Sequence, residues 1–111
     1  MRSSKRGTNP ETQLSAAIHD AVMASGLAIL WRNNSGGVRG TSIRYGLCPG
    51  SADRVGMLVP SGRFLGLEIK MPGKDLDPDQ VRWRGVVERA GGMFVVAHSV
   101  EEALSALRAA R

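Results

Sequence analysis

The sequence predicts an α/β fold in which a small mixed β-sheet, with a central antiparallel hairpin, is flanked by helices. Three observations support this prediction. Helical and strand periodicities alternate along the chain, two strand-like runs at 55–59 and 64–70 are joined by a short turn, and further apolar runs of strand length lie at 27–31 and 93–97. The expected order is helix, strand, long loop, hairpin, helix, strand, helix, which is typical of helices packed on the faces of a sheet.

The length and composition of the chain fit one domain. It has 111 residues, of which 42% are hydrophobic and 23% are charged, and these are ordinary values for a globular protein with a single core. We expect a basic flexible arm over residues 1–8 and a single domain over residues 9–111. No apolar run approaches the roughly 18 residues of a membrane span, and no apolar segment follows the basic N-terminus as in a secretory signal. A cytoplasmic protein without membrane contact is therefore expected.

The charge balance favours a polyanionic partner. The chain has 15 lysines and arginines against 10 acidic residues, which gives a net charge of +5. A positive total by itself indicates only that association would be sensitive to salt. The single cysteine, Cys48, excludes an internal disulfide and a cysteine-based zinc site within one chain. We expect it to be a small, half-buried residue beside a turn.

Local signals predict a first helix that begins after Asn9. Asn9 is a suitable N-cap, Pro10 suits the first helical position, and Gly26 is placed to end the helix. Glu11 in the first turn is either a partner of the helix dipole or, from its inward phase, a contributor to a site. We interpret His19 as a surface histidine. The expected buried face consists of apolar residues at helical spacing: Leu14, Ala17, Ile18, Ala21 and Val22.

A long polar segment, residues 32–53, follows the first predicted strand. It contains five glycines and three arginines, with a possible short strand around residues 42–45. A loop of this length in a compact domain usually has a function. Its glycine-rich backbone suits a close approach to phosphates, although a mobile loop with solvated charges is the alternative. The polar residues with which it would bind nucleic acid are Arg32, Asn33, Asn34, Arg39 and Arg44.

Turn and capping signals define the remaining elements. Residues 60–62 supply the turn of the hairpin, in which Leu65, Leu67 and Ile69 share one face. After the loop "MPGKDLDPDQ", Asp77 caps a helix that Gly91 and Gly92 end. We expect Trp83, Val86, Val87 and Ala90 to form its buried stripe, and Ser99 and Glu102 to form a capping box for the last helix.

Two carboxylates are expected at one edge of the hairpin. Asp53 begins its first strand and Glu68 ends its second, so antiparallel pairing places them side by side, with Lys70 on the same face as Glu68. Two like charges this close are costly unless a proton or cation lies between them. Mg²⁺ prefers oxygen ligands and is typically held by one or two carboxylates, and the carbonyl of Ile69 would point at the same place. A solvated strand end with a Glu68–Lys70 ion pair is the simpler alternative.

The ordered set of motifs resembles a known nuclease family. "PGSAD", a spacing of fifteen positions from Asp53 to Glu68, "EIK", "DPDQ" at a helix start and "AGGMFVVAHSVEEAL" are similar to the stand-alone, phage-type VRR-NUC domain of the PD-(D/E)xK superfamily. The resemblance extends from Glu11 to about Leu104. It implies a restriction-endonuclease-like αβββαβ core and a hydrolase: an endonuclease dependent on Mg²⁺ or Mn²⁺, without an organic cofactor. It also implies DNA repair, branched DNA such as a Holliday junction as substrate, a homodimer, and the host cytoplasm for a viral protein.

The resemblance assigns roles to individual residues. Asp53 and Glu68 would hold the metal, with the carbonyl of Ile69 and the carboxylate of Glu11 as further ligands. Lys70 would act on the attacking water as a general base or stabilise developing negative charge, and the sequence leaves both roles open. Gln80 would lie near the site or, as the third residue after Asp77, simply close a capping box. The residues expected to bind nucleic acid are Arg32, Asn33, Arg39, Arg44, Arg54 and Lys74.

The chain departs from the family pattern at two points. Arg54 stands where the residue after the aspartate is often apolar, so its side chain is expected at the rim of the site. The turn "PGSAD" has one residue more than is common before the acid.

Two rival interpretations remain. The first is a non-catalytic basic DNA-binding module, which would bind DNA without a metal. The second is a nuclease or nickase of the same superfamily that acts with a larger replication and repair partner. No base-reading element is recognised, which favours recognition of shape over sequence. Trp31, Tyr45 and Trp83 would supply dimer contacts or belong to the core.

Overall fold

The computed structural model describes residues 9–34, 36–37 and 39–110, apart from the side chains of residues 36, 37, 44 and 45. The expected basic arm at residues 1–8 lies outside the described residues. The main sheet has four strands in the order β1 (Ala28–Arg32), β4 (Arg54–Leu58), β5 (Phe64–Ile69) and β6 (Met93–Ala97). Neighbouring strands are antiparallel except for β5 and β6, which are parallel. The predicted mixed sheet with a central hairpin is therefore confirmed.

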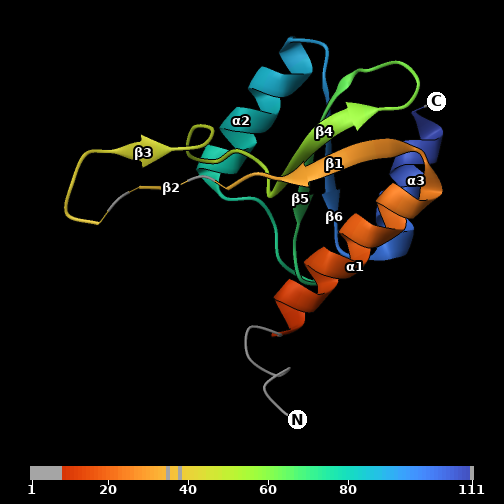
Figure 1. Cartoon of the computed structure of the whole chain (residues 1–111), viewed down its shortest axis with the longest axis horizontal. Helices are drawn as coiled ribbons and strands as arrows, with labels where there is room; N and C mark the ends of the chain where they lie inside the picture. Colours follow the sequence, from red (N-terminus) through yellow and green to blue (C-terminus); the bar gives the residue numbers. More distant parts are fainter. Residues whose placement is uncertain (1–8, 35, 38, 111) are drawn as a thin grey trace.

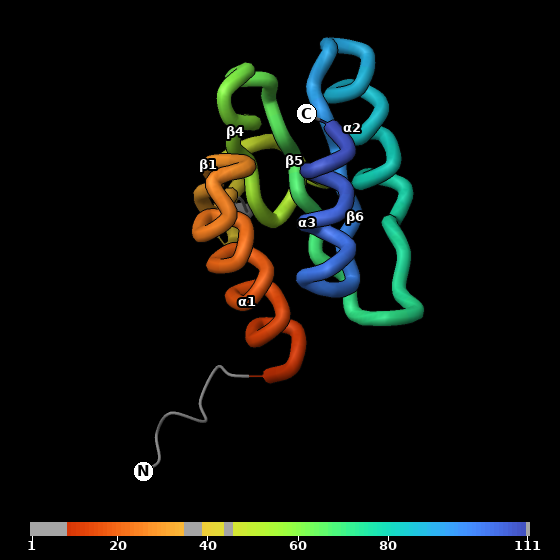
Figure 2. Tube along the Cα trace, turned by 90° about the vertical axis from the view of Figure 1, so that its right-hand side faces the viewer, coloured from red at the N-terminus to blue at the C-terminus, as the bar shows by residue number. Residues whose placement is uncertain are grey.

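Helices cover both faces of the sheet. Figures 1 and 2 show α1 (Pro10–Ser25) and α3 (Val100–Ala109) side by side on one face and α2 (Pro78–Arg89) on the other. A small antiparallel ribbon of β2 (Gly36–Gly37) and β3 (Arg44–Tyr45) projects away from the main sheet (Figure 1). The short strand expected near residues 42–45 is thus present, whereas β2 consists of two glycines and carries no strand signal. Among the described helices, none has both the length and the apolar character needed to span a membrane.

The main core lies between the sheet and the helix pair α1 and α3. Ile18 and Val22 of α1 and Leu107 of α3 are fully buried against apolar side chains of β5 and β6. Capping fixes where α1 begins and ends: Asn9 Oδ1 accepts a hydrogen bond from the N–H of Thr12 at 2.8 Å, and Gly26 adopts a left-handed φ of 75°. The first helix therefore has the predicted bounds.

A smaller apolar cluster lies under α2. Ala52, Val87 and Phe94 are buried there, and Trp83 packs against them with its ring edge-on to Phe94. The stripe predicted for α2 is wrong in part, because Val86 is 51% exposed and Ala90 is also exposed. Among the described elements, α2 packs mainly against β6 and β5, so it buries a narrower face than the helical periodicity implies.

Two further expectations are corrected. Cys48 is exposed, and it lies in the segment between β3 and β4. The capping box of α3 is only half formed: Ser99 Oγ accepts from the N–H of Glu102, but Glu102 Oε1 accepts from the N–H of His98 and not from that of Ser99. The Glu102 carboxylate thus extends one residue further than a capping box requires.

We predict that Gly66→Ala destabilises the protein by about 1–3 kcal/mol through overpacking. An added Cβ would lie 2.8 Å from Cζ3 of Trp83 and 3.3 Å from Cδ1 of Phe94, so α2 would have to move off the sheet. Urea unfolding measures this effect. Gly85→Ala in α2 is the control, because the added Cβ meets only the end of the Arg89 side chain. Alanine also has a higher helix propensity than glycine, so this variant should be more stable than wild type by up to about 1 kcal/mol. Equal stability of Gly66→Ala and wild type would contradict this packing.

Candidate functional site

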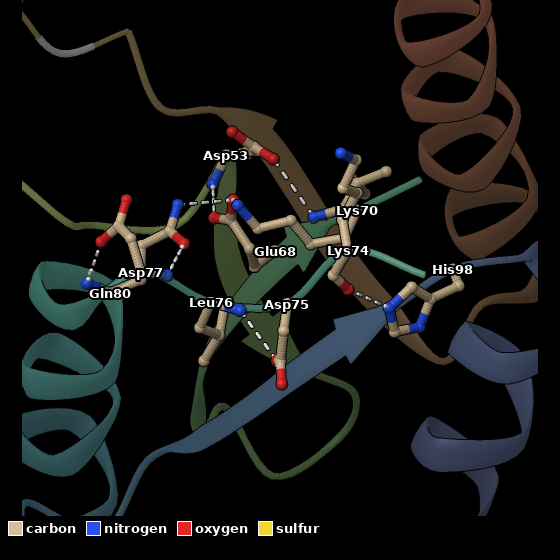
Figure 3. A network of polar contacts seen from close by, with 10 residues as sticks. Asp53, Glu68, Lys70, Lys74, Asp75, Leu76, Asp77, Gln80 and His98 are labelled. Carbon is tan, nitrogen blue, oxygen red and sulfur yellow. Dashed lines mark hydrogen bonds and ion pairs between the residues drawn. The ribbon is translucent and has the colours of Figure 1, made fainter. Parts of the chain in front are cut away.

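The hairpin brings Asp53 and Glu68 together. Arg54 pairs with Leu67 in the ladder, so Asp53, one residue earlier, lies opposite Glu68, one residue later. The N–H of Asp53 donates to Glu68 Oε1 at 3.2 Å, and the N–H of Ile69 donates to Asp53 Oδ2 at 3.1 Å (Figure 3). Each carboxylate is therefore held by a main-chain donor on the opposite strand, and the adjacency expected from the sequence is observed.

Glu68 is an unusual acid because it is buried. Its residue is only 3% exposed, and Lys70 Nζ lies 3.7 Å from its Oε2. Burial and the neighbouring Asp53 raise the pKa of Glu68 to about 7, and the attraction of Lys70 offsets this only in part. Close to neutral pH, this position therefore favours either a bound proton or additional positive charge.

Gln80 fulfils both of the roles that the sequence left open. Its Oε1 accepts from the N–H of Asp77 at 2.9 Å, which completes the capping box of α2. Its Nε2 donates to Glu68 Oε2 at 2.9 Å. Figure 3 shows Gln80 between the start of α2 and the Glu68 carboxylate. The side chain thus fixes the orientation of the buried acid relative to α2.

The paired carboxylates fit a divalent cation. Their oxygens are hard ligands, and a cation would relieve the mutual repulsion that contributes to the raised pKa of Glu68. Asp53 Oδ2 accepts from the N–H of Ile69, and the Asp53 and Glu68 side chains also lie close enough to interact directly. The same part of the chain contains no cluster of three or more acidic, histidine or cysteine side chains suited to a metal. Asp53 and Glu68 are therefore the two carboxylates that lie close enough together to share a cation, and Mg²⁺ is typically held by one or two carboxylates.

Glu11 lies beside this pair but not within it. It is exposed in the first turn of α1 and lines a cleft of about 460 Å³ between α1 and the ends of β1 and β4. Asp53 lines the same cleft, together with Arg32 and Arg54. The inward phase predicted for Glu11 is consistent with this position.

The residues expected to bind nucleic acid differ in how exposed their side chains are. Arg32, Arg39 and Lys74 are exposed. Arg44 lies in β3, and its side chain is outside the described part of the chain. Arg54 and Asn33 are instead half-buried and bind other parts of the protein. Exposure therefore supports solvent contact for the first three residues, while Arg54 and Asn33 already have partners within the chain.

Arg54 and His19 form a contact that sequence reasoning missed. Arg54 Nε donates to His19 Nδ1 at 3.0 Å, so the histidine interpreted as a surface residue is half-buried and joins α1 to β4. Burial and the nearby Arg32 lower the pKa of Arg54, partly offset by Asp53 and Asp20. The two partners are 35 positions apart, and neither carries a sequence signal for the other.

His98 is a second residue that the sequence did not single out. Its Nδ1 lies 3.0 Å from Glu102 Oε1 and its Nε2 lies 2.9 Å from the carbonyl oxygen of Lys74. These two acceptors, the carbonyl first, raise the pKa of His98, because only the doubly protonated ring donates to both. His98 thereby ties the loop between Lys70 and α2 to the start of α3 (Figure 3).

Comparison with known proteins gives a structural relative. No family model matches the sequence, and no curated protein matches it. Among solved structures, one described as a VRR_NUC domain superposes with a TM-score of 0.60 and 21% sequence identity, over 88% of this chain and 94% of that one. The chain therefore has the fold of a VRR-NUC domain, as the sequence resemblance implied.

We predict that replacing Glu68 by glutamine removes a pH-dependent loss of stability. An acid with a pKa near 7 in the folded protein and 4.5 in the unfolded chain holds its proton more tightly when folded. The free energy of unfolding then falls as the pH rises from about 4.5 to about 7. In metal-free buffer, Glu68→Gln should lack this fall and be more stable than wild type at pH 8, as measured by urea unfolding. Glu88→Gln, an exposed substitution in α2, is the control, and an identical pH profile for Glu68→Gln and wild type would contradict the prediction.

Proposed function

We propose that this protein is a metal-dependent endonuclease that hydrolyses phosphodiester bonds in branched DNA, in the manner of a Holliday junction resolvase. The observation that carries the proposal is the pair of adjacent carboxylates, Asp53 and Glu68, with Lys70 Nζ 3.7 Å from Glu68. The buried Glu68, with its pKa raised to about 7, favours added positive charge at this point. The VRR-NUC fold, which the sequence resemblance links to nucleases, supports the same activity.

The protein side chains would divide the work at this site. The carboxylates of Asp53 and Glu68 would hold Mg²⁺ or Mn²⁺, with the Ile69 carbonyl and Glu11 as further proposed ligands. A divalent cation bound there lowers the pKa of a water molecule and neutralises charge on the phosphate. Gln80 holds the Glu68 carboxylate by its Nε2, so the acid keeps one orientation when the substrate arrives.

Lys70 would act through its positive charge. Its ammonium group forms an ion pair with Glu68, and its side chain is 20% exposed, so it remains accessible from solvent. A lysine side chain beside the reacting phosphate can stabilise the negative charge that develops there. We therefore favour electrostatic stabilisation over general-base catalysis for this residue.

The proposed substrate contacts lie along the segment that leads into the site. The described residues between 33 and 52 leave the end of β1, form the projecting ribbon and return to Asp53 (Figure 1). Arg39 is exposed on this segment, Arg32 is exposed at the end of β1 just before it, and Lys74 is exposed on the loop after Lys70. A net charge of +5 suits contacts with the phosphate backbone, which carry no sequence information of their own. Recognition of branched shape is consistent with such contacts.

A second copy of the chain would cover an apolar strip on the outer face of the sheet. Ile29 pairs with Met57 and Met57 pairs with Phe64, so these side chains share one face. Together with Trp31 they are 37–47% exposed, and Phe64 lies at the edge of α2, where its ring is edge-on to that of Trp83. Contiguous exposed apolar surface of this kind commonly marks an interface. A symmetric dimer with two sites would match the two-fold symmetry of a four-way junction.

Nuclease activity is tested by cleavage of labelled four-way junction, flap and duplex DNA with Mg²⁺, Mn²⁺ or EDTA. We predict cleavage of branched DNA that requires the metal and is slowed roughly 100-fold or more in Glu68→Ala and Lys70→Ala, while DNA affinity in EDTA is retained. Glu88→Ala, at an exposed position of α2, is the control with wild-type rates. Tight binding by the wild type without cleavage under any of these metals would favour a DNA-binding module instead.

The dimer is tested by sedimentation. We predict that the wild type sediments at twice the chain mass of 11.8 kDa and that Met57→Lys is monomeric, because the charge would lie in the centre of the apolar strip. Val81→Lys is the matched control, since Val81 is 55% exposed on α2 and outside the strip. Circular dichroism checks that both variants fold. A monomeric wild type would remove the strip as a dimer interface.

A further inference from the structure

Asn33 binds the turn that carries Asp53 by three hydrogen bonds. Its N–H donates to the carbonyl of Asp53 at 3.0 Å. Its side-chain Nδ2 donates to Ser51 Oγ at 2.7 Å and to the carbonyl of Ala52 at 2.9 Å. One residue at the end of β1 thus contacts three successive residues in front of β4.

These contacts occupy the donors with which Asn33 was expected to bind nucleic acid. An amide nitrogen has two hydrogens, and both are used on Ser51 and Ala52. Asn33 is also half-buried, whereas its neighbour Asn34 is exposed. The amide nitrogen of Asn33 could donate to a phosphate only by giving up at least one of these two hydrogen bonds within the protein.

The position of Asp53 depends on this turn. The strand β4 begins at Arg54, so Asp53 lies just outside the ladder that aligns the hairpin. Its carbonyl accepts from the N–H of Asn33 and, at 3.3 Å, from Arg54 Nη1, while its own N–H donates to Glu68 Oε1. Ala52, immediately before it, is fully buried under α2. The main chain is therefore held on both sides of the Asp53 side chain, and Asn33 provides most of the contacts on the β1 side.

We propose that Asn33 is a positioning residue that sets the Asp53 carboxylate opposite Glu68 by fixing residues 51–53 to the end of β1. This inference rests on the proposed nuclease function for its catalytic consequence. Its structural part stands on the three hydrogen bonds alone. Residues that orient a metal-binding group through hydrogen bonds typically change metal affinity or activity by about 10- to 100-fold when they are replaced.

The test compares Asn33→Ala with Asn34→Ala, since the two variants remove the same side chain from neighbouring positions. We expect Asn33→Ala to lower kcat by about 10- to 100-fold and to raise the metal concentration needed for half-maximal cleavage. DNA affinity in EDTA should be the same for Asn33→Ala and wild type. If Asn33→Ala instead weakens DNA binding in EDTA more than Asn34→Ala and leaves kcat unchanged, Asn33 is a phosphate ligand and the proposal is wrong. If Asn33→Ala does not fold, Asn33→Asp takes its place. Aspartate has the shape of asparagine but lacks the side-chain N–H donors.

Hydrogen exchange separates this inference from the proposed function. The amide of Asp53, which donates to Glu68, can be followed in the full chain without metal or nucleic acid. We expect faster exchange of this amide in Asn33→Ala and wild-type exchange in Asn34→Ala. Absence of cleavage by the wild type would overturn the nuclease proposal and leave this comparison intact, whereas unchanged exchange in Asn33→Ala would overturn the role of Asn33.

Discussion

The antiparallel pairing of β4 with β5 places two carboxylates opposite each other, and the polar structure around them follows from that constraint. The N–H groups of Asp53 and Ile69 each donate to the carboxylate on the other strand. Lys70, just after β5, and Gln80 of α2 both approach Oε2 of Glu68. The pKa of Glu68 is nevertheless raised, so these groups compensate only part of the cost of a buried acid beside another acid. A protein that gained only stability from this position would hold an apolar residue there.

The sequence is sufficient to predict the adjacency of the acids because it depends on local rules. The turn at residues 60–62 sets the register of the hairpin, and register alone decides which residues face each other. The caps of α1 and α2 are likewise read from neighbouring residues, as Asn9 and the Asp77–Gln80 pair show. Gln80 also donates a hydrogen bond to Glu68, which lies 12 positions earlier in the sequence. Its local capping box is thus combined with a longer-range contact. Sequence reasoning recognised both roles of this residue but treated them as alternatives.

Contacts that depend on how whole elements pack could not be derived in the same way. Asn33 with Ser51, His98 with Lys74 and Arg54 with His19 are separated by 18, 24 and 35 positions. A single polar side chain has no periodicity, so nothing in its local sequence names its partner. The prediction of the buried stripe of α2 is wrong in part for a related reason. Periodicity predicts which face of a helix points inward, but not how much of the sheet that face covers. Because α2 packs mainly on β5 and β6, the side chains of Ile29, Trp31 and Met57 on β1 and β4 remain partly exposed.

Arg54 illustrates how the site is assembled from several elements. A half-buried guanidinium beside Arg32 is unfavourable, as the lowered pKa of Arg54 indicates. Its Nε donates to His19 Nδ1, which requires that nitrogen to act as an acceptor and places the ring proton of a neutral His19 on Nε2. Its Nη1 donates to the carbonyl of Asp53, to which Asn33 also donates. Arg54 thus links His19 of α1 to the carbonyl of Asp53, which also accepts from Asn33 at the end of β1. The same helix, α1, carries Glu11. Asp53 is therefore fixed by polar contacts from Asn33, Arg54 and β5, and Arg54 is bound in turn by His19 of α1. The apolar core beneath α1 and α3 keeps these elements in place.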